Sequence, residues 1–149
     1  MVYPAIRPNC GAYIALCVAM HEALNPLVPA LVVEDDPPNA RLLSVLLAVE
    51  GCDVRITRSA EEALEVLSTF PARLIVLDLI LPRMGGLLFA ECLKAAPSTR
   101  DIVLIAVSAV NGLQVERLAK EAGCAACVRK PIDTYTFAQT VAGCLQGKA

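Results

Sequence analysis

The sequence predicts an α/β fold in which a doubly wound, five-stranded parallel sheet carries helices on both faces. From Ala30 onward, five short apolar runs alternate strictly with five stretches of helical periodicity. Four of the runs are continuously apolar, which is typical of parallel strands covered on both faces, whereas the run at 54–57 is a weaker strand signal. Because crossovers between parallel strands are right-handed, this order favours a doubly wound arrangement. Hydrophobic residues make up 56% of the 149 residues, enough to build the core that such a fold needs.

Each apolar run is an expected strand, and the first two helical stretches carry clear boundary signals. The strands are expected at 31–33, 54–57, 74–77, 102–107 and 126–128. Asp36 suits an N-cap before a Pro-Pro pair at 37–38, and Gly51 ends this helix. Ser59 and Glu62 have the spacing of a capping box and begin the second helix.

The three later helices are expected from apolar spacing. The third covers 87–93, and the fourth covers 111–121 with Leu113 and Leu118 turned toward the core. Asp133 caps the last helix, where apolar side chains recur at 137, 141 and 145. Side chains four residues apart share one helix face, which predicts a stripe packed against the sheet.

Residues 1–29 form an N-terminal extension of different character, ahead of a domain expected at 30–146 and a tail at 147–149. The extension holds two charged side chains and four prolines. It is too apolar for a solvated tail and too interrupted by proline for a long regular element. Three interpretations stay open: it packs on a partner or a second copy, it covers the domain's own surface, or Met20 is the true start.

Composition excludes several functional classes. The net charge is −2 and aromatic residues make up 4%, so the chain lacks the basic face and stacking platform of nucleic-acid binders, and no direct DNA binding is expected. No run reaches the roughly 20 apolar residues of a membrane span, and no targeting segment is evident. A cytoplasmic protein without membrane contact is therefore expected.

The seven cysteines are scattered through apolar stretches, which favours reduced, mostly buried thiols over a disulfide framework. Cys124 and Cys127 form a CxxC pair. A redox or zinc role would need a helix N-terminus beside the pair or further ligands, and the one histidine, His21, is distant in sequence. A structural role is favoured, with a redox or metal role as the alternative.

Four of the five expected strands are followed by residues that could form one phosphoryl site. Glu34 and Asp35 follow the first strand, Asp78 the third, Ser108 the fourth and Lys130 the fifth. In a doubly wound sheet, sites form at the carboxyl ends of the strands, so these side chains are expected to converge on one rim. Each residue type alone is common at a cap or turn. Their occurrence in order at four strand ends indicates a site.

Three carboxylates on one rim repel one another unless a cation lies among them. Oxygen ligands without His or Cys select Mg²⁺ over zinc. A metal ion and a lysine can neutralise charge on a transferring phosphoryl group, and a serine hydroxyl can hydrogen-bond one of its oxygens. Asp78 ends the most buried run and is the best candidate for a nucleophile that forms an acyl phosphate.

Four sequence blocks resemble the signature blocks of the receiver domain of two-component response regulators. They are LVVEDD at 31–36, LDLILPRMGG at 77–86, VSA at 107–109 and VRKP at 128–131. The resemblance implies a flavodoxin-like sheet with strand order 2-1-3-4-5. It also implies a signalling protein, not a conventional enzyme, whose Asp78 accepts a phosphoryl group from a histidine kinase or a histidine phosphotransfer protein.

The resemblance implies a role for each site residue. Glu34 and Asp35 hold Mg²⁺ together with Asp78 and the backbone carbonyl of Ile80. Ser108 is the switch hydroxyl that moves toward the phosphoryl group.

Lys130 contacts the phosphoryl group in the family pattern, and its peptide bond to Pro131 is cis. The implied output partner is a downstream effector protein that binds around 111–120 and 134–141, and a homodimer is a further option. Because few residues follow 145, a stand-alone receiver or a fragment of a larger regulator is expected.

Three positions depart from the family pattern. Gly85 replaces the acidic residue that often precedes the loop glycine, Gly86. Cys127 stands where a switch aromatic is usual, and cysteine has too little bulk for that readout. Ile80 cannot orient an attacking water as an amide or a carboxylate could, which predicts slow self-dephosphorylation.

Other functions fit these residues less well. The main alternative is a degenerate receiver that acts as an unphosphorylated protein-interaction module, although all core residues are present. An aspartyl-phosphate phosphohydrolase needs a carboxylate at position 80 as its acid and base. A nucleotide binder needs a glycine-rich loop in place of the acidic, proline-containing segment 35–38.

Overall fold

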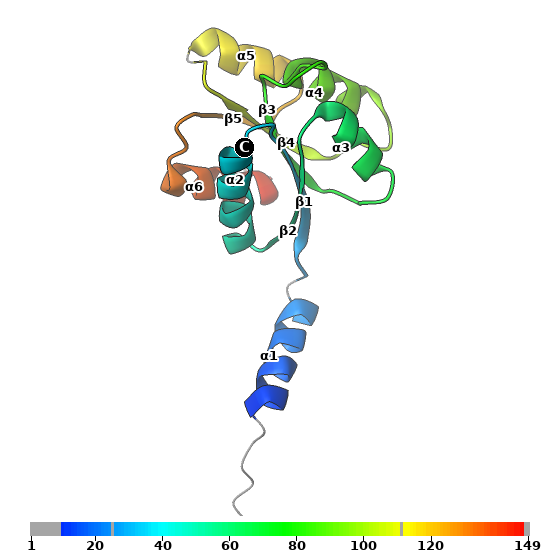
Figure 1. Ribbon diagram of the computed structural model, residues 1–149, viewed down its shortest axis with the longest axis vertical. Helices are drawn as coiled ribbons and strands as arrows, with labels where there is room; N and C mark the ends of the chain where they lie inside the picture. The colour runs from blue at the N-terminus through cyan, green and yellow to red at the C-terminus, as the bar shows by residue number, and fades with distance from the viewer. Residues whose placement is uncertain (1–9, 25, 111, 148–149) are drawn as a thin grey trace, which may run out of the picture.

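The computed structural model describes residues 10–24, 26–110 and 112–147 (Figure 1). Its strands are β1 Val28–Val33, β2 Cys52–Thr57, β3 Leu74–Asp78, β4 Val103–Ser108 and β5 Ala126–Arg129. They form one parallel sheet with the order β2-β1-β3-β4-β5. The helices that alternate with them are α2 Pro37–Val49, α3 Ala60–Leu67, α4 Gly86–Ala95, α5 Leu113–Glu121 and α6 Thr134–Leu145. The predicted fold class and strand order are confirmed.

Helices cover both faces of the sheet because successive residues of a strand point to opposite sides. In β1, Leu31 and Val33 belong to the core beneath α3, α4 and α5, whereas Ala30 and Val32 belong to the core beneath α2 and α6 (Figure 1). All four are fully buried. Each Leu or Val buried in this way stabilises the fold by about 1.5–3 kcal/mol. Strand β3 is buried at every residue and lies third of the five strands. Its last residue, Asp78, therefore lies in the middle of the carboxyl edge of the sheet.

The predicted helix caps are formed. Three side chains accept a hydrogen bond from the N–H three residues onward, at 2.8–3.2 Å: Asp36 from Asn39, Ser59 from Glu62 and Asp133 from Thr136. Such caps stabilise a helix by about 1 kcal/mol. After α2, Gly51 has a φ of 85°, a left-handed conformation that glycine adopts without strain. Because Asp36 caps α2, the two acids before it are left for the rim of the sheet.

The prediction that Leu113 and Leu118 face the core is wrong. Leu113 is 81% exposed and Leu118 is 42% exposed, whereas Ala119 is fully buried. The inward side of α5 is marked by the buried Ala119, with the half-buried Val115 one turn before it and the buried C-cap residue Ala122 after it. At 100° per residue the two leucines lie about 100–120° away from Ala119, so they point toward solvent.

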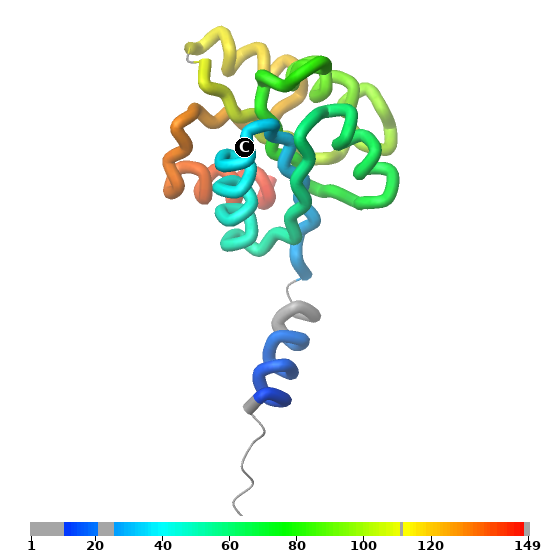
Figure 2. Tube along the Cα trace, viewed as in Figure 1, coloured from blue at the N-terminus to red at the C-terminus, as the bar shows by residue number. Residues whose placement is uncertain are grey.

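The expectation that the N-terminal extension is too interrupted for a long regular element is also wrong. The 15-residue helix α1, Cys10–Leu24, lies there. The four prolines, at 4, 8, 26 and 29, all fall outside it, so none removes a helical hydrogen bond. Figures 1 and 2 show α1 projecting from the amino end of β1, and its described side chains are exposed. No helix in the described ranges is long and apolar enough to span a membrane.

Candidate functional site

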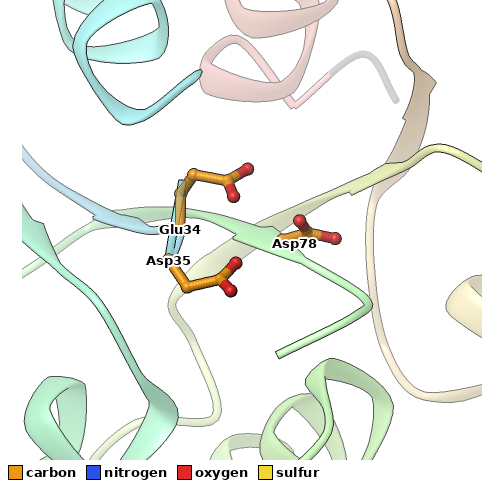
Figure 3. A group of neighbouring side chains, drawn as sticks. All are labelled: Glu34, Asp35 and Asp78. Carbon is orange, nitrogen blue, oxygen red and sulfur yellow. The ribbon is translucent and has the colours of Figure 1, made fainter. Parts of the chain in front are cut away.

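The three predicted carboxylates meet at the carboxyl edge of the sheet. Glu34 and Asp35 follow β1, Asp78 ends β3, and one carboxylate oxygen from each lies within 4.8 Å of the others (Figure 3). Strand register causes this meeting, because Val33 pairs with Leu77 and the next residues along the two neighbouring strands are Glu34 and Asp78. Glu34 and Asp78 are 1% and 6% exposed, whereas Asp35 is exposed.

Backbone N–H groups orient the two buried carboxylates. Asp36 N donates to Glu34 Oε1 at 3.1 Å, and Ile80 N donates to Asp78 Oδ1 at 2.9 Å. Glu34 N itself donates to Thr57 O at 3.0 Å, which extends the pairing of β1 with β2 by one residue. Each buried acid therefore presents one oxygen to the backbone and its second oxygen to the rim.

Lys130 joins the two buried carboxylates. Its Nζ lies 2.8 Å from Glu34 Oε2 and 2.8 Å from Asp78 Oδ2. Lys130 follows β5, and its N–H donates to Ser108 O at 2.8 Å, which continues the pairing of β5 with β4. The Lys130–Pro131 peptide bond is cis, as the resemblance implied.

The pKa values at the rim reflect burial and the pairing of Lys130 with two carboxylates. Burial raises the pKa of Glu34, the charge of Asp78 raises it further, and hydrogen bonds from Lys130 and Asp36 only partly oppose this. For Lys130, burial acts to lower the pKa, but the hydrogen bonds to Asp78 and Glu34 outweigh burial and raise it. Three carboxylates thus face one ammonium group, and the site favours a further cation.

Ser108 lies at the same rim, but its hydroxyl bonds its own loop. The side chain is 1% exposed. Its Oγ accepts a hydrogen bond from Val110 N at 3.1 Å and lies 3.2 Å from Val110 O, to which it can donate. Asp78 pairs with Val107 across the sheet, so Ser108 lies one residue beyond the partner of Asp78. The structure brings Ser108 to the site without a hydrogen bond to the carboxylates.

In the loop after Asp78, Gly86 is required because no side chain would fit there, whereas Gly85 has room for one. A Cβ on Gly86 would lie 2.3 Å from the carbonyl oxygen of Asp78, a distance that the backbone does not allow. A Cβ on Gly85 would meet nothing within 4 Å. The start of α4 therefore packs directly on the backbone of Asp78, and Gly85 in place of an acidic residue changes no packing.

The donor set fits a hard divalent cation. The rim offers carboxylate oxygens and, within the described residues, no cluster that includes a histidine or cysteine nitrogen or sulfur. Asp35 is exposed, and its carboxylate makes no hydrogen bond within the described ranges. Beside Glu34 and Asp35, a groove of about 780 Å³ runs along α2 toward Ile56 of β2. Oxygen ligands with solvent access are what Mg²⁺ prefers.

The CxxC pair has the environment of structural thiols. Cys124 is 5% exposed, and burial together with the neighbouring Cys127 raises the pKa of its thiol to about 11. Burial likewise raises the pKa of the half-buried Cys127. Reactive thiols require a lowered pKa, so the structural interpretation is the one that fits.

Sequence reasoning missed one residue near the site. Glu61, in the first turn of α3, accepts a hydrogen bond from Met84 N at 3.2 Å through Oε1. The two residues are 23 positions apart, and acidic residues are common in a first helical turn for local reasons. Glu62 is marked by its capping-box spacing from Ser59, whereas no local signal marks Glu61 as the partner of a distant loop.

Comparison with known proteins identifies the family. Residues 30–142 match the response regulator receiver domain family. The chain is 33% identical over 111 residues to the polar-differentiation response regulator DivK of Brucella ovis, which covers 74% of this chain and 90% of DivK. The chain therefore belongs to the response regulator receiver domains of two-component signalling.

Two solved structures show the same fold. A sensor protein from Polaromonas sp. JS666 superposes with a TM-score of 0.75 and 29% identity, over 83% of this chain and 100% of that one. The chemotaxis response regulator CheY4 of Vibrio cholerae superposes with a TM-score of 0.74 and 19% identity, over 79% and 98% of the two chains.

Proposed function

We propose that Asp78 accepts a phosphoryl group from the phosphohistidine of a histidine kinase or a histidine phosphotransfer protein, in a reaction that depends on Mg²⁺. The observation that carries the proposal is Lys130 Nζ, 2.8 Å from both Asp78 Oδ2 and Glu34 Oε2. A fixed cation there lies beside the nucleophilic oxygen, where negative charge arrives with the phosphoryl group. The phosphorylated receiver then changes its affinity for a downstream effector protein or passes the group on.

In the proposed step, a carboxylate oxygen of Asp78 forms a bond to phosphorus while the bond between phosphorus and the donor's imidazole nitrogen breaks. The imidazole leaves with that electron pair and takes up a proton from solvent. Lys130 Nζ moves from the carboxylate oxygen to a phosphoryl oxygen, so it stays paired throughout. The N–H of Ile80 keeps hold of the other carboxylate oxygen, which fixes the direction of attack.

Glu34, Asp35, Asp78 and the backbone carbonyl of Ile80 are the residues that would hold Mg²⁺. When bound, the ion would supply positive charge to the phosphoryl oxygens during transfer. Lys130 occupies one oxygen of each buried acid, which leaves the exposed Asp35 as the most accessible carboxylate of the set.

The proposed switch runs through Ser108. Turning its hydroxyl toward a phosphoryl oxygen breaks the contacts with Val110 and frees the segment that leads into α5. Cys127 is half-buried and packs against the core beneath α5, and it cannot fill the volume of an aromatic ring. The change is therefore expected to reach partners through the 108–110 segment, as a shift of population between two loop positions.

The phosphorylated form is expected to be long-lived. Ile80 is 60% exposed and carries no group that could orient a water against the acyl phosphate. Slow hydrolysis suits a signalling protein and not a conventional hydrolase. Hydrolysis within seconds in purified protein would contradict this part of the proposal.

Intact-mass measurement after incubation with a small acyl phosphate and MgCl₂ tests the proposal. The wild-type chain is expected to gain one phosphoryl group, and Asp78→Asn or added EDTA is expected to abolish the gain. Asp101→Asn makes the same change at an exposed aspartate before β4, at the opposite edge of the sheet, and serves as the matched control. If the wild-type chain stays unlabelled where a control receiver is labelled, the chain is a degenerate interaction module.

A further inference from the structure

Glu61 connects α3 to the loop that follows the phosphoacceptor, residues 79–85. Its Oε1 accepts the hydrogen bond from Met84 N at 3.2 Å, and its Oε2 lies 3.6 Å from Arg83 Nη2. In the described part of the chain, no other side chain from a distant segment hydrogen-bonds this loop. One carboxylate therefore holds two consecutive loop residues.

The second carboxylate oxygen of Glu61 supports this link between Glu61 and the loop. Oε2 is shielded from solvent and has no hydrogen-bond partner within the described ranges, so the guanidinium of Arg83 is the charge that offsets it. Arg83 has a φ of 60°, a left-handed conformation that is uncommon outside glycine. With this turn, the Arg83 side chain and the next N–H reach the same carboxylate.

The near end of the loop is fixed differently. Leu79 N donates to Val107 O at 3.0 Å, and Gly86 N donates to Leu79 O at 3.1 Å. Ile80 N donates to Asp78 Oδ1. The bonds of Leu79 N and Ile80 N anchor the start of the loop to the sheet, and the bond of Gly86 N joins the two ends of the loop. Glu61 holds the residues just before the end, Arg83 and Met84.

We infer that Glu61 is a positioning residue of the phosphorylation site: by holding Arg83 and Met84 it sets the loop, and through the loop the backbone carbonyl of Ile80, for Mg²⁺. This inference rests on the proposed function. The groups that hold metal ligands in place commonly decide metal affinity, since a loop that moves must be ordered when the ion binds. The hydrogen bonds of Glu61 with its own N–H and that of Met84, and the charge of Arg83, lower its pKa, so the carboxylate is ionised at neutral pH.

Three variants separate positioning from a general effect on α3. Glu61→Ala removes both contacts, and Glu61→Gln keeps an oxygen for Met84 N but loses the charge opposite Arg83. Glu65→Ala removes an exposed carboxylate from the same helix and is the matched control. The readouts are the Mg²⁺ dissociation constant from calorimetric titration with MgCl₂ and the hydrogen-exchange rates of the amides of residues 79–86.

Glu61→Ala is expected to weaken Mg²⁺ binding about 3- to 10-fold, less than the roughly 10- to 100-fold lost when a direct partner of a ligand is removed. The loop amides are expected to exchange faster, with Glu61→Gln intermediate and Glu65→Ala unchanged. Equal dissociation constants for the wild type and both Glu61 variants would overturn the inference while leaving the proposed function intact. A wild-type chain that binds no Mg²⁺ would contradict the proposed function and this inference together.

Discussion

Lys130 Nζ and Asp78 Oδ2 lie 2.8 Å apart although they come from the ends of two strands that are not neighbours. Lys130 follows β5 and Asp78 ends β3, with β4 between them. The lysine stem therefore crosses the end of β4, where Ser108 accepts the Lys130 N–H through its carbonyl. A flexible, single-charged side chain of this length suits the crossing, whereas the planar fork of arginine has different reach and geometry.

Lys130→Met is expected to slow phosphorylation of Asp78 by about 100-fold, the lower end of what loss of one charge-stabilising group costs. Methionine keeps most of the stem and removes the ammonium that would follow the charge onto the phosphoryl oxygen. The measurement is the initial rate of the mass gain with a small acyl phosphate. Arg129→Met is the control, because its guanidinium pairs with Glu116 on the surface. A rate within threefold of the wild type for Lys130→Met would remove Lys130 from the mechanism.

Glu34→Gln is expected to change how stability depends on pH. Because the folded pKa of Glu34 is raised above 4.5, the folded state holds more protons than the unfolded state above that pH. The stability that Glu34 contributes is fully present below pH 4.5 and is lost as the pH rises through the pKa of Glu34 in the folded state. In Mg²⁺-free buffer, the free energy of unfolding of Glu34→Gln should therefore gain on that of the wild type as the pH rises from about 4.5 toward 7.

Urea denaturation at a series of pH values measures this difference. Lys130 does not contribute to it, since its pKa is raised above 10.5 and lies beyond the scan. Glu91→Gln, at an exposed position on α4, controls for the loss of one carboxylate. A constant gap between the wild type and Glu34→Gln across the scan would show that Glu34 titrates normally.

Leu113→Ala is expected to change the free energy of unfolding by less than about 0.5 kcal/mol, because the side chain is 81% exposed. Leu93→Ala in α4 makes the same truncation at a site that is 1% exposed and should cost about 2–5 kcal/mol. Chemical denaturation of the two variants measures both. A large decrease in the free energy of unfolding for Leu113→Ala would show that this leucine packs in the core.

These leucines show where sequence reasoning reaches its limit. Strand runs, caps and helix ends could be predicted because each depends on neighbouring residues, as with Asp36 and Asn39. The side of α5 that faces the core depends on where the sheet lies, and two alanines at 119 and 122 gave a weaker hydrophobic signal than two leucines. In the extension, counting prolines was not enough, because their positions outside α1 decide whether a helix forms.

The candidate site also has features that the sequence predicts and features that only the three-dimensional structure shows. Its residues could be named because buried strands stop at polar residues, and a parallel sheet gathers such ends on one edge. The contact between Lys130 and Glu34 joins residues 96 positions apart. Predicting it required the strand order, which the family resemblance supplied. Glu61 belongs to no strand end and to no family block, and its partner became visible only in three dimensions.

Thiol labelling at pH 7.5 is expected to follow burial and pKa: among the described cysteines, the exposed Cys17 and Cys92 are modified first and Cys124 last. Cys92 is exposed, whereas Cys124 is buried and has a pKa of about 11, so little thiolate is available. Peptide mass mapping after timed alkylation gives the order. In urea the order should vanish, because the burial that raises the pKa is lost. Rapid labelling of Cys124 in the folded chain would restore the redox alternative.

Gly86→Ala and Gly85→Ala form a matched pair that tests how closely α4 packs on the phosphoacceptor. The Cβ of Gly86→Ala would lie 2.3 Å from Asp78 O, a contact that backbone movement must relieve, whereas that of Gly85→Ala meets nothing within 4 Å. Overpacking of this kind costs about 1–3 kcal/mol.

Gly86→Ala is therefore expected to lower the free energy of unfolding and to slow phosphorylation, because the shift moves the backbone of Asp78 away from Lys130. Gly85→Ala has an ordinary φ of −66° and should match the wild type in both respects. Urea denaturation and the initial rate of the mass gain measure the two effects on the same samples. If Gly86→Ala loses stability but is phosphorylated at the wild-type rate, α4 moves to relieve the contact and the backbone of Asp78 stays in place. The acceptor strand would then be the rigid part of the site, and the loop held by Glu61 the part that adjusts.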